Sequence, residues 1–191
     1  MGVRLAYEIT GWLWEFIGVL WLAAMFTNKR AVRVQVGFAR FAQIGLGVPA
    51  AFLMADRGIP VRALNARFIP FNSVAVYAGV AILAAGLSFA IWARVYLGRN
   101  WSGTVQVKRN HELMTGGPYA LVRHPIYTGL LIGFVGTAIV FRQVRCLLGL
   151  ALILAAWWMK LRVEERFMTE QFGERYLAYR SRTKALIPWV L

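Results

Sequence analysis

The chain has 191 residues, of which 59% are hydrophobic and only 16% are charged. This composition is too apolar for an ordinary soluble domain and is typical of a membrane protein. We expect no nucleic-acid partner despite the net charge of +14, because the cations lie between long apolar runs rather than along one polar helix face. The single cysteine, Cys146, excludes an intramolecular disulfide and a multi-cysteine metal site.

Five apolar runs approach the length of about 20 residues that a membrane-spanning helix requires. In chain order they are residues 7–26, 34–55, 71–95, 126–141 and 144–160. The first run contains an acidic residue and lacks a small-residue cleavage site, so we expect an uncleaved helix rather than a signal peptide. The fourth run is short and reaches the fifth through the segment RQVR, which predicts a tight helical hairpin.

Lys and Arg are distributed unevenly between the two sides that these runs would separate. Cytoplasmic loops carry the excess of positive charge in membrane proteins. This rule places residues 27–33, residues 98–124 and the basic C-terminal tail in the cytoplasm, and the N-terminus outside.

The predicted fold is therefore all-α and polytopic, with about five transmembrane helices, a C-terminal helical hairpin and a cytoplasmic amphipathic tail helix. We expect one integral-membrane domain over residues 1–191. Within it, residues 1–70 form an N-terminal helical pair, and residues 71–191 form the catalytic, cofactor-binding half.

Two polar segments are predicted to share the cytoplasmic face. Residues 98–125 are too long for a simple connector, and a loop of that length in a compact protein is usually functional. The second segment starts within the last apolar run and is predicted to continue as an amphipathic helix. Its aromatic residues recur at helical spacing, at Phe167, Phe172, Tyr176 and Tyr179.

The long loop contains a His-Pro pair and a Gly-Gly pair. Pro125 disfavours a helical conformation at His124, so the imidazole is held at the start of a helix and can point into a cavity. The alternative is a simple helix start with a solvated imidazole. Gly116 and Gly117 allow close backbone approach and exposed amide donors for a ligand, although any helix-breaking turn has the same composition.

The last apolar run ends with the segment KLRVEER, which places Lys160 and Glu164 four residues apart on one helical face. Placing a carboxylate near hydrocarbon costs free energy, which favours a functional or paired role for Glu164 and Glu165. The alternative is a solvated helix end with local ion pairs. His111 and His124 are the only histidines, and no catalytic-triad or metal-ligand spacing occurs, so hydrolase and metalloenzyme functions are disfavoured and no metal site is expected.

Four motifs occur in a specific order: GPYALVRHPIYTG, then EE, then FGERYLAYRSR, and finally IPW. Together they resemble the isoprenylcysteine carboxyl methyltransferase family, which consists of small integral-membrane methyltransferases, and this chain looks like a prokaryotic-type member. The resemblance covers roughly residues 98–189. It implies a cytoplasm-facing pocket for S-adenosylmethionine. It also implies methylation of a carboxylate on a lipophilic, isoprenoid-like or prenylcysteine-like acceptor. This acceptor would be a small molecule or a lipid-anchored substrate, reached through membrane lipids.

The resemblance also implies roles for individual residues. At the position of the family's carboxylate-binding arginine the chain has Lys160, followed by Arg162, and Arg94 is a second candidate cation for the substrate. The implied cofactor contacts are Gln106, His111, Glu112, Leu113, Met114, Gly117, Tyr119, His124, Pro125, Ile126, Tyr127 and Glu164.

Three other functions stay open. A phospholipid amine N-methyltransferase would have a related architecture. However, residues 123–127, which we call the elbow, read RHPIY rather than the Asn-Pro version of that branch. The cations Arg123, Lys160 and Arg162 of this chain also suit an anionic acceptor better than an ammonium group. A membrane sterol-type reductase would bind NADPH instead. A membrane scaffold or transporter half would need more polar residues at the midplane than Arg40 and Gln43 provide.

Overall fold

The computed structural model describes residues 2–25, 31–34, 38–55, 59–98, 106–108 and 113–188. Two short strands pair antiparallel, with Val34 opposite Gln106. The strands are β1 (Ala31–Val34) and β2 (Gln106–Lys108). The helices are α1 (Gly2–Met25), α2 (Phe38–Ala55), α3 (Ser73–Leu97), α4 (Pro118–Leu121), α5 (Pro125–Phe141), α6 (Val144–Phe172) and α7 (Glu174–Arg182).

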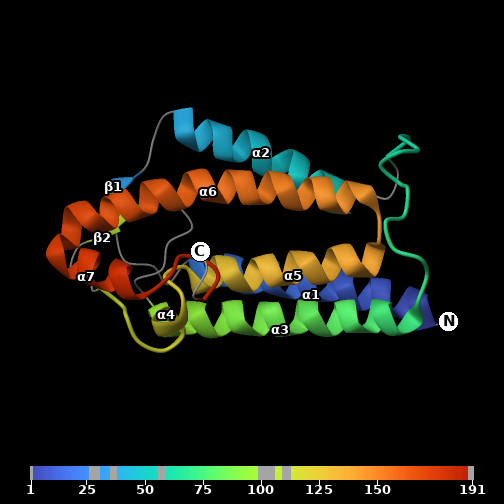
Figure 1. The fold of residues 1–191 in the computed structure, drawn as a ribbon, viewed down its shortest axis with the longest axis horizontal. Helices are drawn as coiled ribbons and strands as arrows, with labels where there is room; N and C mark the ends of the chain where they lie inside the picture. Colours follow the sequence, from blue (N-terminus) through green and yellow to red (C-terminus); the bar gives the residue numbers. More distant parts are fainter. Residues whose placement is uncertain are drawn as a thin grey trace.

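The long helices form two layers (Figure 1). Helix α3 packs along α5 and α1, whereas α2 packs along α6. Each of the five predicted apolar runs lies mostly within a helix, although Val34 belongs to β1 and α6 continues to Phe172, and this confirms the expectation of a mainly helical protein. The small helices α4 and α7 and both strands gather at one end of these layers (Figure 1).

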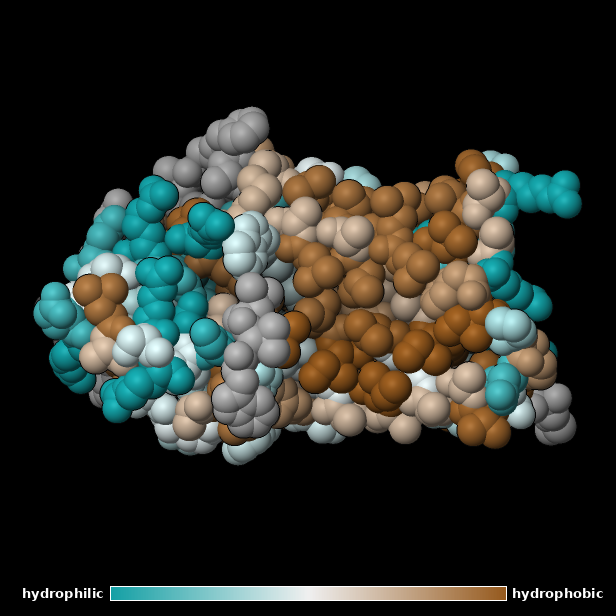
Figure 2. Space-filling view, in the orientation of Figure 1, coloured by the Kyte–Doolittle hydropathy of each residue, from teal (hydrophilic) through white to brown (hydrophobic). Residues whose placement is uncertain are grey.

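Apolar side chains cover the middle of the molecule, and hydrophilic side chains gather at its ends (Figure 2). Many large apolar side chains are exposed, including Phe41, Val74 and Val95, as expected for a surface that faces lipid. Among the described residues, α3 and α6 are long and apolar enough to cross a membrane. The apolar parts of α2 and α5 are shorter, so five separate spans stay a prediction.

Helices α3 and α5 approach each other through glycines. A Cβ atom on Gly86 would lie 2.6 Å from the carbonyl oxygen of Gly129, and a Cβ on Gly129 would lie equally close to the carbonyl oxygen of Gly86. Such close backbone contact is typical of helices packed in membranes. It fixes α5 against α3 and thereby positions the residues at the start of α5.

The C-terminal tail differs from the predicted continuous helix. Helix α6 extends to Phe172, and Gly173 then interrupts it with φ of +50° while donating its N–H to the carbonyl of Thr169. A positive φ is readily adopted by glycine and turns the chain. The separate helix α7 therefore buries Tyr176 and Tyr179 against the rest of the protein.

Candidate functional site

The His-Pro pair begins α5 as the sequence predicted. His124 is the residue before the helix, with φ of −125° and ψ of 60°, and Pro125 is its first helical residue. Pro125 is buried, and the carbonyl of His124 accepts the N–H of Thr128. The imidazole is therefore attached to a backbone position that helix packing holds in place.

Backbone hydrogen bonds hold the C-terminal tail beside this elbow. The N–H of Arg123 donates to the carbonyl of Lys184 over 2.8 Å, and the N–H of His124 donates to the carbonyl of Ala185 over 3.0 Å. The hydroxyl of Tyr179 donates to the carbonyl of Tyr119 over 2.5 Å. Helix α7 and the tail thus join the site to the end of α6.

Glu165 forms the strongest ionic contacts of the site. Its Oε1 atom accepts from Nε of Arg123 over 2.8 Å and from Nη2 of the same guanidinium over 2.5 Å. Its Oε2 atom lies 3.5 Å from Nε of Arg180. Arg123 also donates to the carbonyl of Thr183. Glu165 consequently connects α6, the elbow and α7, and Arg123 is engaged in this structural role rather than available to an acceptor.

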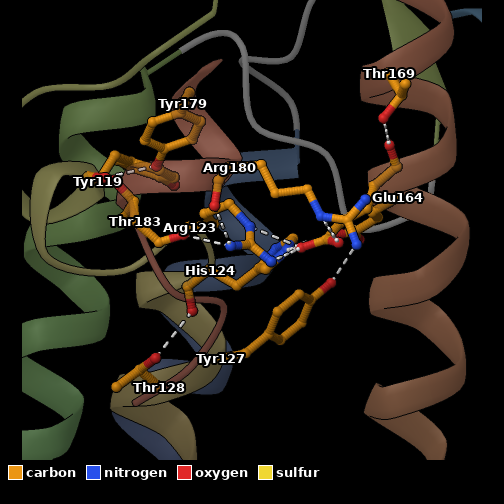
Figure 3. Close-up of polar contacts among 11 residues, drawn as sticks. Tyr119, Arg123, His124, Tyr127, Thr128, Glu164, Thr169, Tyr179, Arg180 and Thr183 are labelled. Atoms are coloured by element: carbon orange, nitrogen blue, oxygen red, sulfur yellow. Dashed lines mark hydrogen bonds and ion pairs between the residues drawn. The ribbon is translucent and has the colours of Figure 1, made fainter. Parts of the chain in front are cut away.

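Glu164 faces a different set of partners (Figure 3). The hydroxyl of Tyr127 donates to its Oε1 atom over 2.7 Å. Its Oε2 atom lies 3.5 Å from Nδ1 of His124, and its Oε1 atom lies 4.0 Å from Nζ of Lys160. The ammonium group of Lys160 also lies 5.2 Å from the centroid of the Tyr127 ring. We call His124, Tyr127, Lys160 and Glu164 the Glu164 cluster.

His124 bridges the two carboxylates, since its Nε2 atom lies 3.4 Å from Oε1 of Glu165. Burial by itself lowers the pKa of an imidazole, but contacts with Glu164 and Glu165 outweigh burial and raise the pKa of His124 above its ordinary value. The two carboxylates therefore favour the imidazolium form of His124 more than water does.

The pKa of His124 predicts that stability depends on pH. Because the folded-state pKa exceeds the unfolded value of about 6.5, the proton stabilises the fold fully below that pH. This contribution is lost as the pH rises through the folded-state pKa. We expect the midpoint of thermal unfolding in detergent to fall as the pH rises above about 6.5, and we expect a smaller fall in His124→Gln. An equal fall in both proteins would contradict the bridge.

The remaining predicted cofactor contacts fall into two groups. Leu113, Met114 and Ile126 are half-buried, and Tyr119 is buried. His111 and Glu112 lie outside the described residues, as does the side chain of Gln106, whose backbone belongs to β2. Their predicted roles stay predictions.

Gly117 has a structural reason for being glycine. Its φ is +56°, and a Cβ atom there would lie 2.6 Å from Cε2 of Tyr96. A Cβ on Gly116 would lie 2.5 Å from the hydroxyl oxygen of Tyr96. The pair therefore admits a tyrosine from α3, whereas its predicted use as an amide donor to a ligand stays a prediction.

Two predicted substrate cations have other surroundings. The guanidinium of Arg162 lies 4.9 Å from the ring centroid of Trp158, and its side chain is exposed. Arg94 is buried and donates to the carbonyls of Gly98 and Ala24, so it connects the C-terminal ends of α3 and α1. The structure thus brings only Lys160 of the three cations to Glu164.

The sequence did not reveal the network of Arg123, Glu165, Arg180 and Thr183. Its members come from the elbow, α6, α7 and the tail. The one local signal was the acidic pair itself, because two adjacent carboxylates on a helix point in different directions and need different partners.

The sequence profile of the phospholipid methyltransferase family matches residues 74–175 of this chain. The chain is 35% identical over 101 residues to a protein-S-isoprenylcysteine O-methyltransferase of Schizosaccharomyces pombe, covering 51% of this chain and 43% of that protein. It is 34% identical over 104 residues to the cobalt-zinc-cadmium resistance protein CzcN of Cupriavidus metallidurans, covering 54% of this chain and 46% of that protein. The chain spans about half the length of these curated relatives.

A solved structure has a similar fold. It is that of a eukaryotic intramembrane Ras methyltransferase, isoprenylcysteine carboxyl methyltransferase, with a TM-score of 0.53 and 23% identity. The match covers 79% of this chain and 52% of that one. The family profile covers more than half of this chain. The relatives confirm the resemblance to isoprenylcysteine methyltransferases that the motifs predicted. The chain belongs to the phospholipid methyltransferase family.

Proposed function

We propose that this chain is an integral-membrane methyltransferase that transfers a methyl group from S-adenosylmethionine to a carboxylate of a lipophilic, prenylcysteine-like acceptor. The observation that carries the proposal is the Glu164 cluster. It places one carboxylate beside a phenol, an imidazole and an ammonium group at the end of apolar helices. Membership of a methyltransferase family supports this use of the cluster.

The residues of the cluster fit the proposed cofactor. Glu164 accepts one short hydrogen bond, from Tyr127, whereas its contacts with His124 and Lys160 are 3.5 and 4.0 Å long. A carboxylate has about four acceptor positions, so Glu164 retains capacity for the ammonium or ribose hydroxyl groups of the cofactor. S-adenosylmethionine supplies an activated methyl group on a sulfonium, so the reaction needs no strong base.

Lys160 is the residue that we assign to the acceptor. Its side chain is 19% exposed, and Lys160 is the residue at which the apolar run of α6 ends. An ammonium group there binds a carboxylate through charge-assisted hydrogen bonds and orients it while the apolar helices exclude water. Since Arg123 and Arg180 are paired with Glu165, Lys160 is the cation best placed for this role.

The family name favours a second candidate, in which the acceptor is a phospholipid amine. The charges near the cluster argue against it. Three cationic groups, namely Arg123, Lys160 and Arg180, surround two carboxylates, Glu164 and Glu165, and a raised pKa favours a further positive charge on His124. A net positive site attracts an anionic acceptor more strongly than an ammonium group.

Transfer of a labelled methyl group from S-adenosylmethionine tests the acceptor assignment. The probes are N-acetyl-S-farnesylcysteine and phosphatidylethanolamine, each with the purified protein in detergent. We expect label on the farnesylcysteine, and we expect Lys160→Met to lower kcat/KM for it by about tenfold or more, as loss of a charged hydrogen bond predicts. The matched control Arg162→Met changes the same type of residue on the exposed face of α6, and its activity should stay close to wild type.

Label on phosphatidylethanolamine alone would contradict the carboxylate acceptor. Binding of NADPH, without binding of S-adenosylhomocysteine, would contradict the methyltransferase proposal altogether. Equal losses in Lys160→Met and Arg162→Met would remove Lys160 from the acceptor site.

The same proposal includes the orientation of the chain in the membrane and its division into two halves. We place the Glu164 cluster on the cytoplasmic side and the N-terminus outside, because positive residues are concentrated at the end that carries the cluster. Residues 71–191 are the proposed catalytic half, since they supply every residue of the cluster and of its Glu165 network. Residues 1–70 are the proposed N-terminal helical pair.

A further inference from the structure

A second polar region lies at the opposite end of the helical layers, where α5 turns into α6 (Figure 1). The turn is held against the connection that follows α2. The N–H of Arg145 donates to the carbonyl of Leu64 over 2.9 Å, and the N–H of Val144 donates to the carbonyl of Ala66 over 3.0 Å. Two arginines of this turn, Arg142 and Arg145, are only 2% and 0% exposed.

Each buried guanidinium has one terminal nitrogen without a hydrogen-bond partner. Arg145 donates from Nε to Oε1 of Gln143 and from Nη1 to the carbonyl of Leu53, which leaves Nη2 unpaired. Arg142 donates from Nη2 to the hydroxyl of Tyr7, which leaves Nη1 unpaired. Neither arginine has a carboxylate partner within the part of the chain that the structure describes. Buried unpaired donors are costly, so they indicate a missing acceptor.

A cavity of about 130 Å³ adjoins Arg145. It is lined by Tyr7, Arg67, Phe141, Gln143 and Arg145. Arg67 is exposed and contributes a third cation. A water molecule occupies about 30 Å³ of liquid, so the cavity has room for a small polyatomic anion.

The helix ends at this site do not neutralise its cations. Arg145 meets the last turn of α2 at the carbonyl of Leu53, and Arg142 meets the last turn of α5 at the carbonyl of Val140. The C-terminus of a helix carries about half a negative charge. Two such ends offset about one elementary charge, whereas Arg67, Arg142 and Arg145 supply three positive charges. The remaining field is positive.

We propose that this cavity binds a phosphate group, with Arg145 and Arg67 as its direct cationic ligands and Arg142 as a supporting cation. Arginine binds phosphate oxygens in a planar, bidentate geometry, and Arg145, which lines the cavity, has an unpaired donor at Nη2. The site lies where the apolar surface ends (Figure 2). This is the depth of lipid headgroups, so a phospholipid is the nearest source of the phosphate.

Thermal unfolding with defined ligands tests the site independently of methyl transfer. The protein is purified in dodecyl maltoside and phosphate-free buffer, and is titrated with dihexanoylphosphatidylglycerol, inorganic phosphate or dihexanoylglycerol. We expect a saturable rise in the unfolding midpoint with phosphatidylglycerol and none with dihexanoylglycerol, which has the chains without the phosphate. An equal rise with inorganic phosphate at the same concentrations would support the site with a soluble source. No saturable rise with either phosphate compound would overturn the proposal.

Two exposed arginines on the same connection provide a matched pair of variants. Arg67→Gln keeps the backbone bridge between residue 67 and Gln143 but removes the cation that lines the cavity. It should raise the half-saturating ligand concentration by about tenfold. Arg62→Gln removes an exposed cation that does not line the cavity, and its titration should match the wild type. Equal weakening in both variants would overturn the proposal in favour of general surface attraction.

Discussion

Glu165→Gln is expected to lower the free energy of unfolding in detergent by about 3 kcal/mol, because it breaks a largely buried ion pair. The side chains of Arg123 and Glu165 are 10% and 15% exposed. The neutral amide cannot compensate the guanidinium charge, and it also loses the contacts with His124 and Arg180. The loss is measured as a shift of the unfolding transition.

The control for this variant is Glu170→Gln, an exposed glutamate one and a half turns further along α6. Its unfolding transition should remain within about 0.5 kcal/mol of wild type. Equal destabilisation by the two substitutions would show that the contacts of Glu165 with the elbow and α7 do not hold these elements together.

Glu164→Gln is expected to affect cofactor binding more than stability. We expect it to weaken binding of S-adenosylhomocysteine by about 1.5 to 3 kcal/mol, the value of a hydrogen bond to a charged group. This corresponds to roughly 10- to 100-fold in Kd. Stability should fall less than in Glu165→Gln, because the amide oxygen of Gln still accepts from Tyr127 and the charged contacts of Glu164 are longer than those of Glu165 with Arg123. Calorimetry and thermal unfolding measure the two quantities on the same sample.

Comparing the two variants with each other tests the roles of these adjacent glutamates better than either variant does alone. Glu164 and Glu165 share a helix, a charge and a depth, so a nonspecific effect would affect both variants equally. Unchanged affinity in Glu164→Gln, with affinity lost in Glu165→Gln, would show that their roles are exchanged.

Hydropathy was sufficient to predict the helices. The apolar runs at residues 71–95, 126–141 and 144–160 correspond to α3, α5 and α6, because a long apolar segment in lipid must satisfy its own backbone hydrogen bonds. The break at Gly173 was not predicted. Aromatic spacing across it remained helical, and the positive φ of one glycine decides where a helix ends.

Local sequence predicted part of the site. Pro125 fixed the position of His124, and the four-residue spacing of Lys160 and Glu164 placed both on one face of α6. The exposed position of Arg162 follows from the same periodicity, since a residue two positions after Lys160 lies on nearly the opposite face.

The pairings of other cations required the tertiary structure. Arg123 was interpreted as a cation for the acceptor, but Glu165 and the tail carbonyls engage it. Arg94 was assigned to the substrate, but it connects the ends of α1 and α3. Sequence shows that a cation is near a site, whereas its partner depends on segments far away in the chain.

Titration of S-adenosylhomocysteine into the wild-type protein and Glu164→Gln by calorimetry measures whether the chain binds the proposed cofactor through Glu164. A parallel titration with NADPH completes the measurement. We expect saturable binding of S-adenosylhomocysteine to the wild type, binding at least about tenfold weaker in the variant, and no binding of NADPH. Binding of NADPH alone, or equal affinity of both proteins for S-adenosylhomocysteine, would contradict it.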